Sequence, residues 1–321
     1  MTISAPAVLA GGQGRPMLRL AVTLMLVVIV IGVLWVFAPS CFKLNNFINI
    51  LVQASTLAVL SIGMSAVMIG GGIDLSLPFN AALSAVLGAL YMRATGDAIV
   101  GPLVMIAAGI AIGTANGVAV GYLRMIPFVV TLAMMTIANG AAVWLTGSIS
   151  IADIPEIFIA PFFTRYLGLP LSVIIALVMS VLAVILMAKT VFGRWVYAVG
   201  INLRAAEVAR IPVPRVLMLS YVVAGFTAGV AAIMLTGRLA SASSNLASPS
   251  MVLDVVSACV IGGISIYGGA GRVWGAVLGA LFITLLNNAL NAAEVSLYVN
   301  QMIRGAIIVA FIALDGLTRR T

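Results

Sequence analysis

The chain has no histidine and only two cysteines among its 321 residues, so it has few of the side chains that usually act as general bases or metal ligands. Cys41 lies in a predicted loop and Cys259 inside a predicted hydrophobic span, which argues against a disulfide between them. Neither Lys43 nor Lys189 completes a phosphate-binding loop of the G-x-x-x-x-G-K-[ST] type. We therefore predict that the chain has no catalytic residues, no metal site and no cofactor, and that it does not itself hydrolyse ATP.

Charged side chains are also scarce. Only 7% of the residues are charged, 63% are hydrophobic and the mean hydropathy is +1.26, whereas a soluble domain is about 25% charged. Uncharged runs of about 20 residues recur, which is the length that a helix needs to cross the hydrocarbon core. Alternating ten-residue strands of a membrane barrel do not recur. The sequence therefore predicts an all-α, polytopic transmembrane helical bundle, a single domain over 1–321 that is surrounded by membrane lipid.

About ten spans are predicted, with both termini in the cytoplasm. Eleven basic residues then fall in cytoplasmic segments, four in outer segments and Arg304 in the last span, as the positive-inside rule requires. The net charge of +8 does not indicate nucleic-acid binding, because the basic residues stand singly between apolar runs. The predicted spans are 20–38, 47–70, 77–94, 98–123, 126–146, 170–188, 216–237, 251–268, 272–292 and 296–315.

The cytoplasmic segment Lys189–Arg215 is the most polar part of the chain and carries five of its sixteen basic residues. Within it, Leu203–Ala209 consists largely of helix formers, and Pro212 and Pro214 prevent the helix from continuing. The sequence therefore predicts a short helix that is exposed to water on the cytoplasmic side.

Arg204, Glu207 and Arg210 follow one another at intervals of three residues and share one side of this short helix. Such a face either meets a partner protein or is simply solvated. Apolar residues nearby, among them Val196 and Tyr197, favour a docking surface.

Glycine recurs every fourth residue in three parts of the sequence. Positions without side chains let neighbouring helix backbones approach closely inside a membrane, where lipid removes the hydrophobic drive for association. We therefore predict that these series form helix-packing surfaces. They are Gly109, Gly113, Gly117 and Gly121; Gly225 and Gly229; and Gly271, Gly275 and Gly279.

Two glycine-rich runs, GGGIDLS at 70–76 and GGISIYGG at 262–269, separate hydrophobic stretches. Irregular backbone at membrane depth is stable only when it is buried in protein or lines a watery cavity, so each run is either a gate or re-entrant turn, or a tight turn at the membrane surface. Asp74 in the first run either caps the following helix or relays protons. The adjacent glycines and Ser76 favour capping.

Amide side chains also recur at helical spacing inside predicted spans. They either line an aqueous path for an uncharged, hydroxyl-rich solute, to which they would offer donors and acceptors, or form hydrogen bonds between helices. With Asp74, the candidates for a pathway or gate are Asn49, Gln53, Asn116, Asn139, Asn287, Asn288 and Asn300.

Five segments in this order resemble the permease subunits of bacterial ABC importers of the ribose/xylose/arabinose type, and together they extend over most of the chain. They are GGGIDLSLP at 70–78, NGVAVGYLRMIPFVVTLAMMTIANG at 116–140, GRWVYAVGINLRAAEVARIPV at 193–213, VIGGISIYGGAGRVWGAVLGAL at 260–281 and NNALN at 287–291. The chain departs from the family pattern at Arg210, where glycine is common, and at Pro78, where glycine usually follows the Asp-Leu-Ser run.

The resemblance implies a multi-pass protein of the bacterial inner membrane that imports a small polar solute, most often a monosaccharide, by alternating access. It implies a pathway formed with a second permease copy or paralogue, a periplasmic solute-binding protein, and a cytoplasmic ATP-binding subunit that holds ATP and Mg. The segment 193–213 would be the coupling helix on that subunit. The implied coupling residues are Arg194, Arg204, Ala205, Ala206, Glu207, Arg210 and Pro212.

An ion-coupled secondary transporter of a small polar solute is the alternative. It would need no ATPase, but it would need ionisable residues inside the membrane beyond Asp74, Asp254 and Arg304. The identity of the solute, and whether the two permeases are identical, are left open by the sequence.

Overall fold

The computed structural model describes residue 32, residues 44–296 and 298–303, and residues 305, 306 and 309. The predicted first span 20–38 apart from residue 32, half of the last one, 296–315, and both termini lie outside the described residues. The helices are α2 (Leu44–Ile69), α3 (Leu77–Thr95), α4 (Val100–Gly121), α5 (Pro127–Thr146), α6 (Glu156–Phe163), α7 (Leu171–Lys189), α8 (Val191–Ile201), α9 (Leu203–Val208), α10 (Val213–Leu239), the 3-10 turn η2 (Ser244–Leu246), α11 (Pro249–Ile261) and α12 (Val273–Ala292).

The described part of the chain is all-helical apart from one small hairpin, in which β1 (Arg165–Tyr166) pairs antiparallel with β2 (Leu169–Pro170). Seven of its helical stretches are long and apolar enough to cross a membrane. Helix α3 matches the predicted span 77–94 in position but is not among these seven. The bundle fold is therefore confirmed, whereas ten spans and cytoplasmic termini stay predictions.

The predicted span 251–268 is too long at its C-terminal end. Helix α11 ends at Ile261, because Gly263 turns the backbone with a φ of +82°. The amide N–H of Gly263 donates to the Val260 carbonyl, and the N–H of Ile264 donates to the Cys259 carbonyl, at 2.9 Å each. This pair of hydrogen bonds around a left-handed residue is the Schellman turn that closes many helices.

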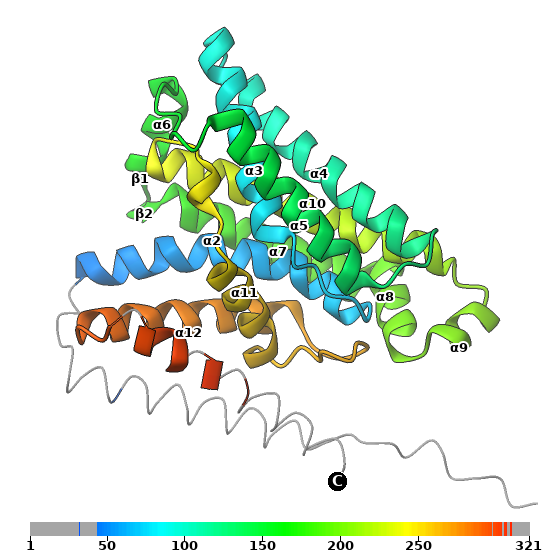
Figure 1. Ribbon diagram of the computed structural model, residues 1–321. Helices are drawn as coiled ribbons and strands as arrows, with labels where there is room; N and C mark the ends of the chain where they lie inside the picture. The colour runs from blue at the N-terminus through cyan, green and yellow to red at the C-terminus, as the bar shows by residue number, and fades with distance from the viewer. Residues whose placement is uncertain (1–31, 33–43, 297, 304, 307–308, 310–321) are drawn as a thin grey trace, which may run out of the picture.

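The glycine series of α4 forms a helix-packing surface, as predicted, and its partner is α10. A side chain at Gly113 would collide with the Tyr221 carbonyl oxygen, and a Cβ at Gly117 would lie 2.6 Å from the Met218 carbonyl oxygen. The backbones of α4 and α10 therefore touch directly, which is the packing that small residues allow in membranes. Figure 1 shows the two helices side by side.

The third glycine series is interrupted. Gly275 and Gly279 of α12 do pack on the backbone of α11, at Gly262 and Ala258. Gly271, however, lies before the start of α12 and has a φ of +125°. The prediction that Gly271 belongs to the helix stripe is therefore wrong, because its backbone serves a turn instead.

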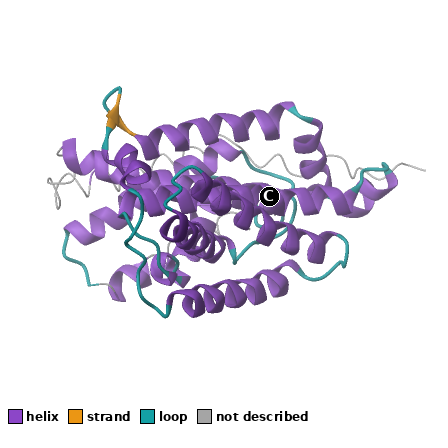
Figure 2. Ribbon diagram, turned by 90° about the horizontal axis from the view of Figure 1, so that it is seen from above, coloured by secondary structure: helices purple, strands orange, loops and turns teal. Residues whose placement is uncertain are grey.

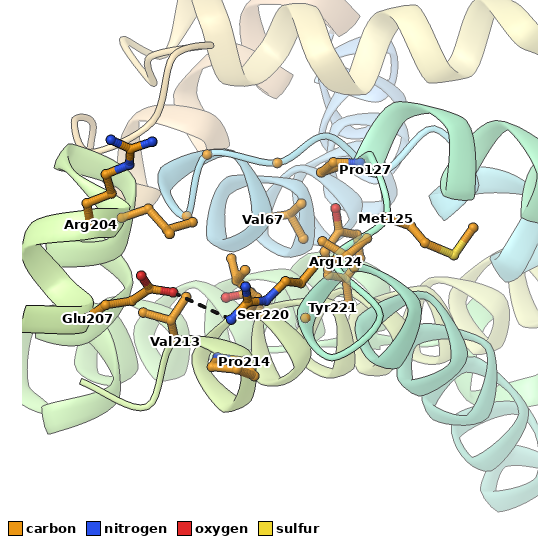
Figure 3. Close-up of a pocket in the computed structure, with 17 residues that line it drawn as sticks. Val67, Arg124, Met125, Pro127, Arg204, Glu207, Val213, Pro214, Ser220 and Tyr221 are labelled. Carbon is orange, nitrogen blue, oxygen red and sulfur yellow. Dashed lines mark ion pairs between the residues drawn. The ribbon is translucent and has the colours of Figure 1, made fainter. Parts of the chain in front are cut away.

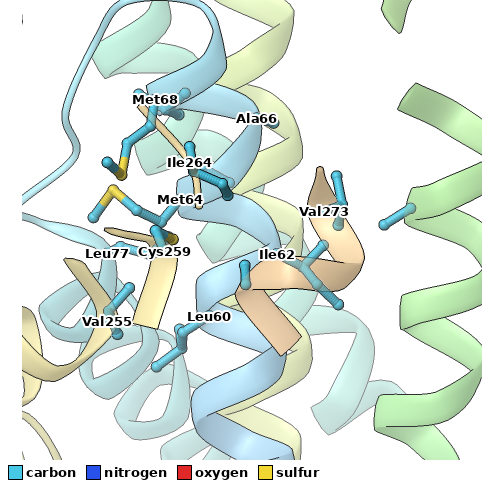
Figure 4. Close-up of a cluster of buried hydrophobic side chains, with 14 of the residues drawn as sticks. Leu60, Ile62, Met64, Ala66, Met68, Leu77, Val255, Cys259, Ile264 and Val273 are labelled. Carbon is cyan, nitrogen blue, oxygen red and sulfur yellow. The ribbon is translucent and has the colours of Figure 1, made fainter. Parts of the chain in front are cut away.

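The hydrophobic core lies around α2. Leu60, Met64 and Met68 of this helix pack with Val255 and Cys259 of α11 (Figure 4). The Cys259 thiol is fully buried, 3.4 Å from a carbonyl oxygen of α2. Its burial inside a span agrees with the prediction, and it is a core residue rather than a reactive one.

The connections collect at two ends of the bundle. Helices α8 and α9 lie at one end, and α6 with the β1–β2 hairpin lies at the other (Figures 1 and 2). The segments 70–76, 122–126, 190–212 and 262–272 share the end with α8 and α9, as their contacts show. We call this the coupling end and the other the opposite end.

Candidate functional site

The polar segment predicted from the sequence folds as two helices rather than one. Helix α8 begins after Thr190, whose hydroxyl accepts the Gly193 N–H, and α9 begins after Asn202, whose side-chain oxygen accepts the Ala205 N–H at 3.0 Å. Asn202 has extended backbone angles, so it ends α8 and caps α9 at the same point. The predicted short helix at Leu203–Ala209 is present as α9, and α8 is an addition.

A left-handed turn ends α9. The Arg210 N–H donates to the Glu207 carbonyl and the Ile211 N–H donates to the Ala206 carbonyl, both at 3.0 Å. Arg210 therefore occupies the position of this Schellman turn that usually holds glycine, with a φ of +58°. A side chain here adds local strain, which gives a physical reason why glycine is common at this position in the family that the sequence resembles.

The predicted coupling residues mostly face water. Arg194, Arg204, Ala205, Glu207 and Arg210 are exposed, and Pro212 is half-buried. Ala206 is the exception, because it is buried against the core and anchors α9. Its side chain is therefore not available to a partner in this conformation.

A cavity of about 470 Å³ lies between α9, the turn from α4 to α5 and the end of α2 (Figure 3). Its lining includes Gly70–Gly72, Arg204 and Tyr221. Across its mouth, Arg124 Nη2 lies 3.9 Å from Glu207 Oε1, with 81% and 47% of the two side chains exposed. Such an exposed pair contributes little stability. Sequence reasoning placed Arg124 in a cytoplasmic loop but gave it no role, because only the fold brings it to α9.

The first glycine-rich run is also a helix-ending turn. Gly71 has a φ of +87°; its N–H donates to the Met68 carbonyl and the Gly72 N–H donates to the Val67 carbonyl, both at 3.0 Å. These are the same hydrogen bonds that close α11 at Gly263. Both glycine runs therefore contain a turn that ends a helix, and the choice between a gate or re-entrant turn and a tight turn at the membrane surface stays a prediction.

Asp74 is buried directly after this turn, with 1% of its surface exposed. Its Oδ1 accepts the Ser76 N–H at 3.0 Å and the Ser76 hydroxyl at 2.6 Å, and the Asn116 amide donates to that hydroxyl at 2.9 Å. The N-cap of α3 is Ser76, so Asp74 fixes the capping residue rather than capping the helix itself. Pro78 suits the first turn of α3, where its missing N–H is not needed.

Two acceptor atoms in this cluster, Asp74 Oδ2 and Asn116 Oδ1, are buried and find no hydrogen-bond donor among the described residues. Burial raises the pKa of the Asp74 carboxyl from 3.8 to about 6, against the opposing effect of the hydrogen bonds from Ser76 and Asn116. The carboxyl is therefore poised to be protonated in mildly acidic conditions.

Most other pathway candidates lie at the opposite end. The Asn46 amide donates to Asn288 Oδ1 at 3.1 Å, which joins the first turn of α2 to α12. Asn287 lies 3.5 Å from Asp254 of α11, and the Asn300 amide donates to Asn291 at 3.3 Å. We call these amide pairs, with the exposed Asn49 and Gln53 of α2, the amide seam.

The predicted pathway residues therefore do not meet at one place. Asn49 and Asp74 lie at opposite ends of α2, whose 26 residues span about 39 Å. Asn139 lies apart from both groups, on an exposed face of α5. For Asn287, Asn288 and Asn300, the observed pairs match the hydrogen bonds between helical segments that the sequence left as an alternative.

Comparison with known proteins decides what this bundle belongs to. Residues 46–312 match the family described as "Branched-chain amino acid transport system / permease component". The chain belongs to this permease family. It is accordingly a transporter subunit rather than an enzyme, and a multi-pass protein of the bacterial inner membrane.

Three relatives show how far the similarity extends along the permease. The ribose import permease protein RbsC of Escherichia coli (strain K12) is 32% identical over 297 residues, which cover 91% of this chain and 92% of the relative. RbsC of Bacillus subtilis (strain 168) is 34% identical over 294 residues, 91% and 90% of the two chains. The galactose/methyl galactoside import permease protein MglC of Haemophilus influenzae is 33% identical over 308 residues, 90% and 91%. No solved structure matches the chain.

Proposed function

We propose that this permease imports a monosaccharide across the bacterial inner membrane, driven by an ATPase that binds at the coupling end. One observation carries the substrate class: relatives named as ribose and galactose permeases align over about nine-tenths of this chain and of their own. The family description names branched-chain amino acids instead, so an amino acid is the solute against which the proposal must be tested.

The surface proposed for the ATPase is the pair α8 and α9 within the segment Lys189–Arg215. Five of the seven predicted coupling residues are exposed there, Ala206 anchors α9 in the core, and Pro212 is the N-cap residue of α10. A docking surface with fixed helix caps keeps its shape when a partner pushes on it. ATP and Mg would be bound by the ATPase, and no cofactor is expected in this chain.

The proposed cycle is a driven change between outward-open and inward-open states. A partner can shift such an equilibrium only if it binds the two states with different affinity. The ATPase, at the coupling end, and a periplasmic binding protein, at the opposite end, would each favour one state. A second permease copy or paralogue would complete the pathway, with about ten spans in each copy and both termini in the cytoplasm.

The amide seam is the part of the proposed pathway that suits a sugar. Asn49 and Gln53 are exposed on α2, and Asn287 Oδ1 is buried without a donor among the described residues. A sugar loses hydrogen bonds to water when it leaves solution, and amides replace both donors and acceptors without a charge. Hydroxyl-rich solutes therefore fit these amides, whereas the carboxylate of an amino acid would meet the Asp254 carboxylate and no cationic side chain among the described residues of the seam.

The experiment is uptake into vesicles that contain the permease, its copurified ATPase and the cognate binding protein. Labelled ribose, galactose and leucine are compared, with and without ATP. We expect ATP-dependent uptake of a sugar and none of leucine. The variant Glu207→Arg should abolish uptake, whereas Glu294→Arg, which changes an exposed residue of the same charge after α12, should not.

Two results would refute this proposal. Uptake of leucine alone would show that the solute class is wrong. Sugar uptake that persists without ATP and follows an ion gradient would support the secondary transporter instead.

A further inference from the structure

Three segments that are far apart in the sequence meet through their backbones at the coupling end. The Gly269 N–H, between α11 and α12, donates to the Ile69 carbonyl at the end of α2, at 2.8 Å. A Cβ at Gly200, near the end of α8, would collide with the same carbonyl oxygen and lie 2.5 Å from the Gly269 nitrogen. A Cβ at Gly268 would lie 2.9 Å from the Gly71 Cα and 3.0 Å from the Gly200 oxygen. No side chain separates these backbones.

A side chain of α8 makes a second connection to the same loop. Tyr197, one turn before Gly200, donates a hydrogen bond from its hydroxyl to the Gly271 carbonyl at 2.7 Å. A Cβ at Gly271 would lie 2.7 Å from the Ile264 Cα, so the loop is folded tightly on itself. Helix α8 therefore contacts this loop at two points, one on each side of Ala270.

These contacts differ from those of α9. The turn from α4 to α5 contacts α9 through the exposed ion pair Arg124–Glu207, in which long side chains bridge 3.9 Å. Flexible, solvated side chains can change rotamer and so accommodate a small displacement of a neighbouring helix. Backbones in direct contact have no rotamer to change, so a displacement of one backbone pushes on the other. A displacement of α8 must therefore move the end of α2 and the 262–272 loop, or break their contacts.

We propose that Gly200 and Tyr197 form the joint through which α8 moves these two loops together during ATP-driven transport. The proposal rests on the proposed function and assigns both as positioning residues. One loop leads through Asp74 and Ser76 into α3, and the other leads into α12, which carries part of the amide seam. The joint thus connects the ATPase surface to α3 and to α12.

The test compares Tyr197→Phe with Tyr122→Phe in the assembled transporter. Tyr122 also lies at the coupling end and is exposed, and its hydroxyl makes no hydrogen bond within the described residues. Two quantities are measured: the ATPase that copurifies, and the sugar taken up per ATP hydrolysed. We expect Tyr197→Phe to assemble normally and to lose about two- to tenfold in sugar per ATP, the range for one hydrogen bond. Tyr122→Phe should match the unsubstituted protein.

Gly200→Ala is the stronger variant, because even a methyl group collides there. We expect it to retain the ATPase yet lose sugar uptake. Should Gly200→Ala fail to fold, Tyr197→Phe still tests whether α8 moves the two loops. If Tyr197→Phe and the unsubstituted protein take up the same amount of sugar per ATP, the proposal that Tyr197 and Gly200 form a joint is wrong.

Amide hydrogen exchange gives a readout that does not depend on transport. In the unsubstituted complex, ATP should change exchange in segments 69–76 and 262–272 together, and in Tyr197→Phe the change in 262–272 should be lost. If ATP binding changes the amide hydrogen exchange of neither segment, the proposed joint is likewise refuted. Failure of the proposed function looks different, since the unsubstituted complex would then show no ATP-dependent sugar uptake.

Discussion

The coupling end and the opposite end of the bundle differ in how distant segments meet, although the amide of Asn116 also donates to Ser76 at the coupling end. At the coupling end, glycines bring backbones into direct contact, as at Gly117 on Met218 and at Gly200 on Ile69. At the opposite end, amide side chains join the helices in pairs such as Asn46 with Asn288. Backbone contacts fix one arrangement, whereas an amide can exchange its partner for another donor or acceptor.

This difference fits the work proposed for each end. A region that passes a displacement from a partner to distant helices gains from contacts that cannot be absorbed by side-chain rotation. A region that receives a sugar gains from groups that can release a hydrogen bond to a helix and form one to the solute. Four substitutions test the comparison, in decreasing order of expected effect.

Gly117→Val should have the largest effect on stability. The added side chain overlaps the backbone of α10, where a Cβ alone would lie 2.6 Å from the Met218 oxygen and 2.9 Å from its Cα. Overpacking of this kind typically costs about 1–3 kcal/mol, and more where no flexible group can yield. We expect a strong decrease in the thermal unfolding temperature of the purified permease.

Gly140→Val is the matched control, because a Cβ at Gly140 on α5 meets nothing within 4 Å. Its unfolding temperature should remain close to that of the unsubstituted protein. If both variants lower the unfolding temperature equally, the effect of valine reflects helix propensity and not contact between backbones. The proposed contrast between the two ends would then be unsupported.

Asp74→Asn should change how stability depends on pH. The pKa of the buried carboxyl is raised from 3.8 to about 6, so folding favours its protonated form. The corresponding stabilisation is complete below about pH 4 and is lost as the pH rises through 6, to a total of about 3 kcal/mol. Asparagine is neutral at every pH, so the variant should match the parent near pH 4.5 and exceed its stability at pH 7.5.

Denaturant titrations of both proteins at pH 4.5, 6 and 7.5 would measure this effect. The groups that face Asp74 from neighbouring elements are Ser76, Asn116 of α4 and Tyr221 of α10. None of these side chains titrates between pH 4.5 and 7.5. An unchanged difference between variant and parent across the three pH values would show that Asp74 does not change its charge there.

Arg210→Gly should stabilise the end of α9 by about 1 kcal/mol. Arg210 has a φ of +58° in a turn whose counterparts at Gly71 and Gly263 have glycine, and glycine adopts this conformation without the steric cost of a Cβ. Hydrogen exchange at the Ile211 N–H, which donates to Ala206, should slow several-fold. Faster exchange at Ile211 would contradict the assignment of strain to this turn.

The sequence was sufficient to predict the elements whose signal is local. Hydropathy located α4, α5 and α7 to within about two residues, and the spacing of glycines predicted packing surfaces on α4 and on α10, though not that these two surfaces meet. The helix formers at Leu203–Ala209 predicted α9. Each of these depends on side chains that are neighbours along one helix, so their pattern is visible in the order of residues.

What the sequence could not predict depends on contacts between distant segments. Nothing in the run 262–269 indicates that Gly269 bonds to Ile69, or that Gly200 fits between them. The ion pair of Arg124 with Glu207 joins residues 83 positions apart in the sequence. Gly271 was included in a helix-packing series because its four-residue spacing to Gly275 does not reveal that the helix begins only at Val273.

Asn288→Ala should have the smallest effect on stability and a larger one on transport. The substitution removes the oxygen that accepts from Asn46, and a hydrogen bond between helices in a membrane contributes only about 0.6 kcal/mol on average. The unfolding temperature should therefore change little. If the seam exchanges this bond for one to the sugar, the concentration for half-maximal uptake should rise several-fold while ATP hydrolysis stays the same. Asn245→Ala, which changes an exposed amide residue of η2 outside the seam, serves as control. Equal uptake by all three proteins would make the seam an internal connection between helices and place the sugar path elsewhere, because a residue that contacts the solute cannot be truncated without weakening its binding.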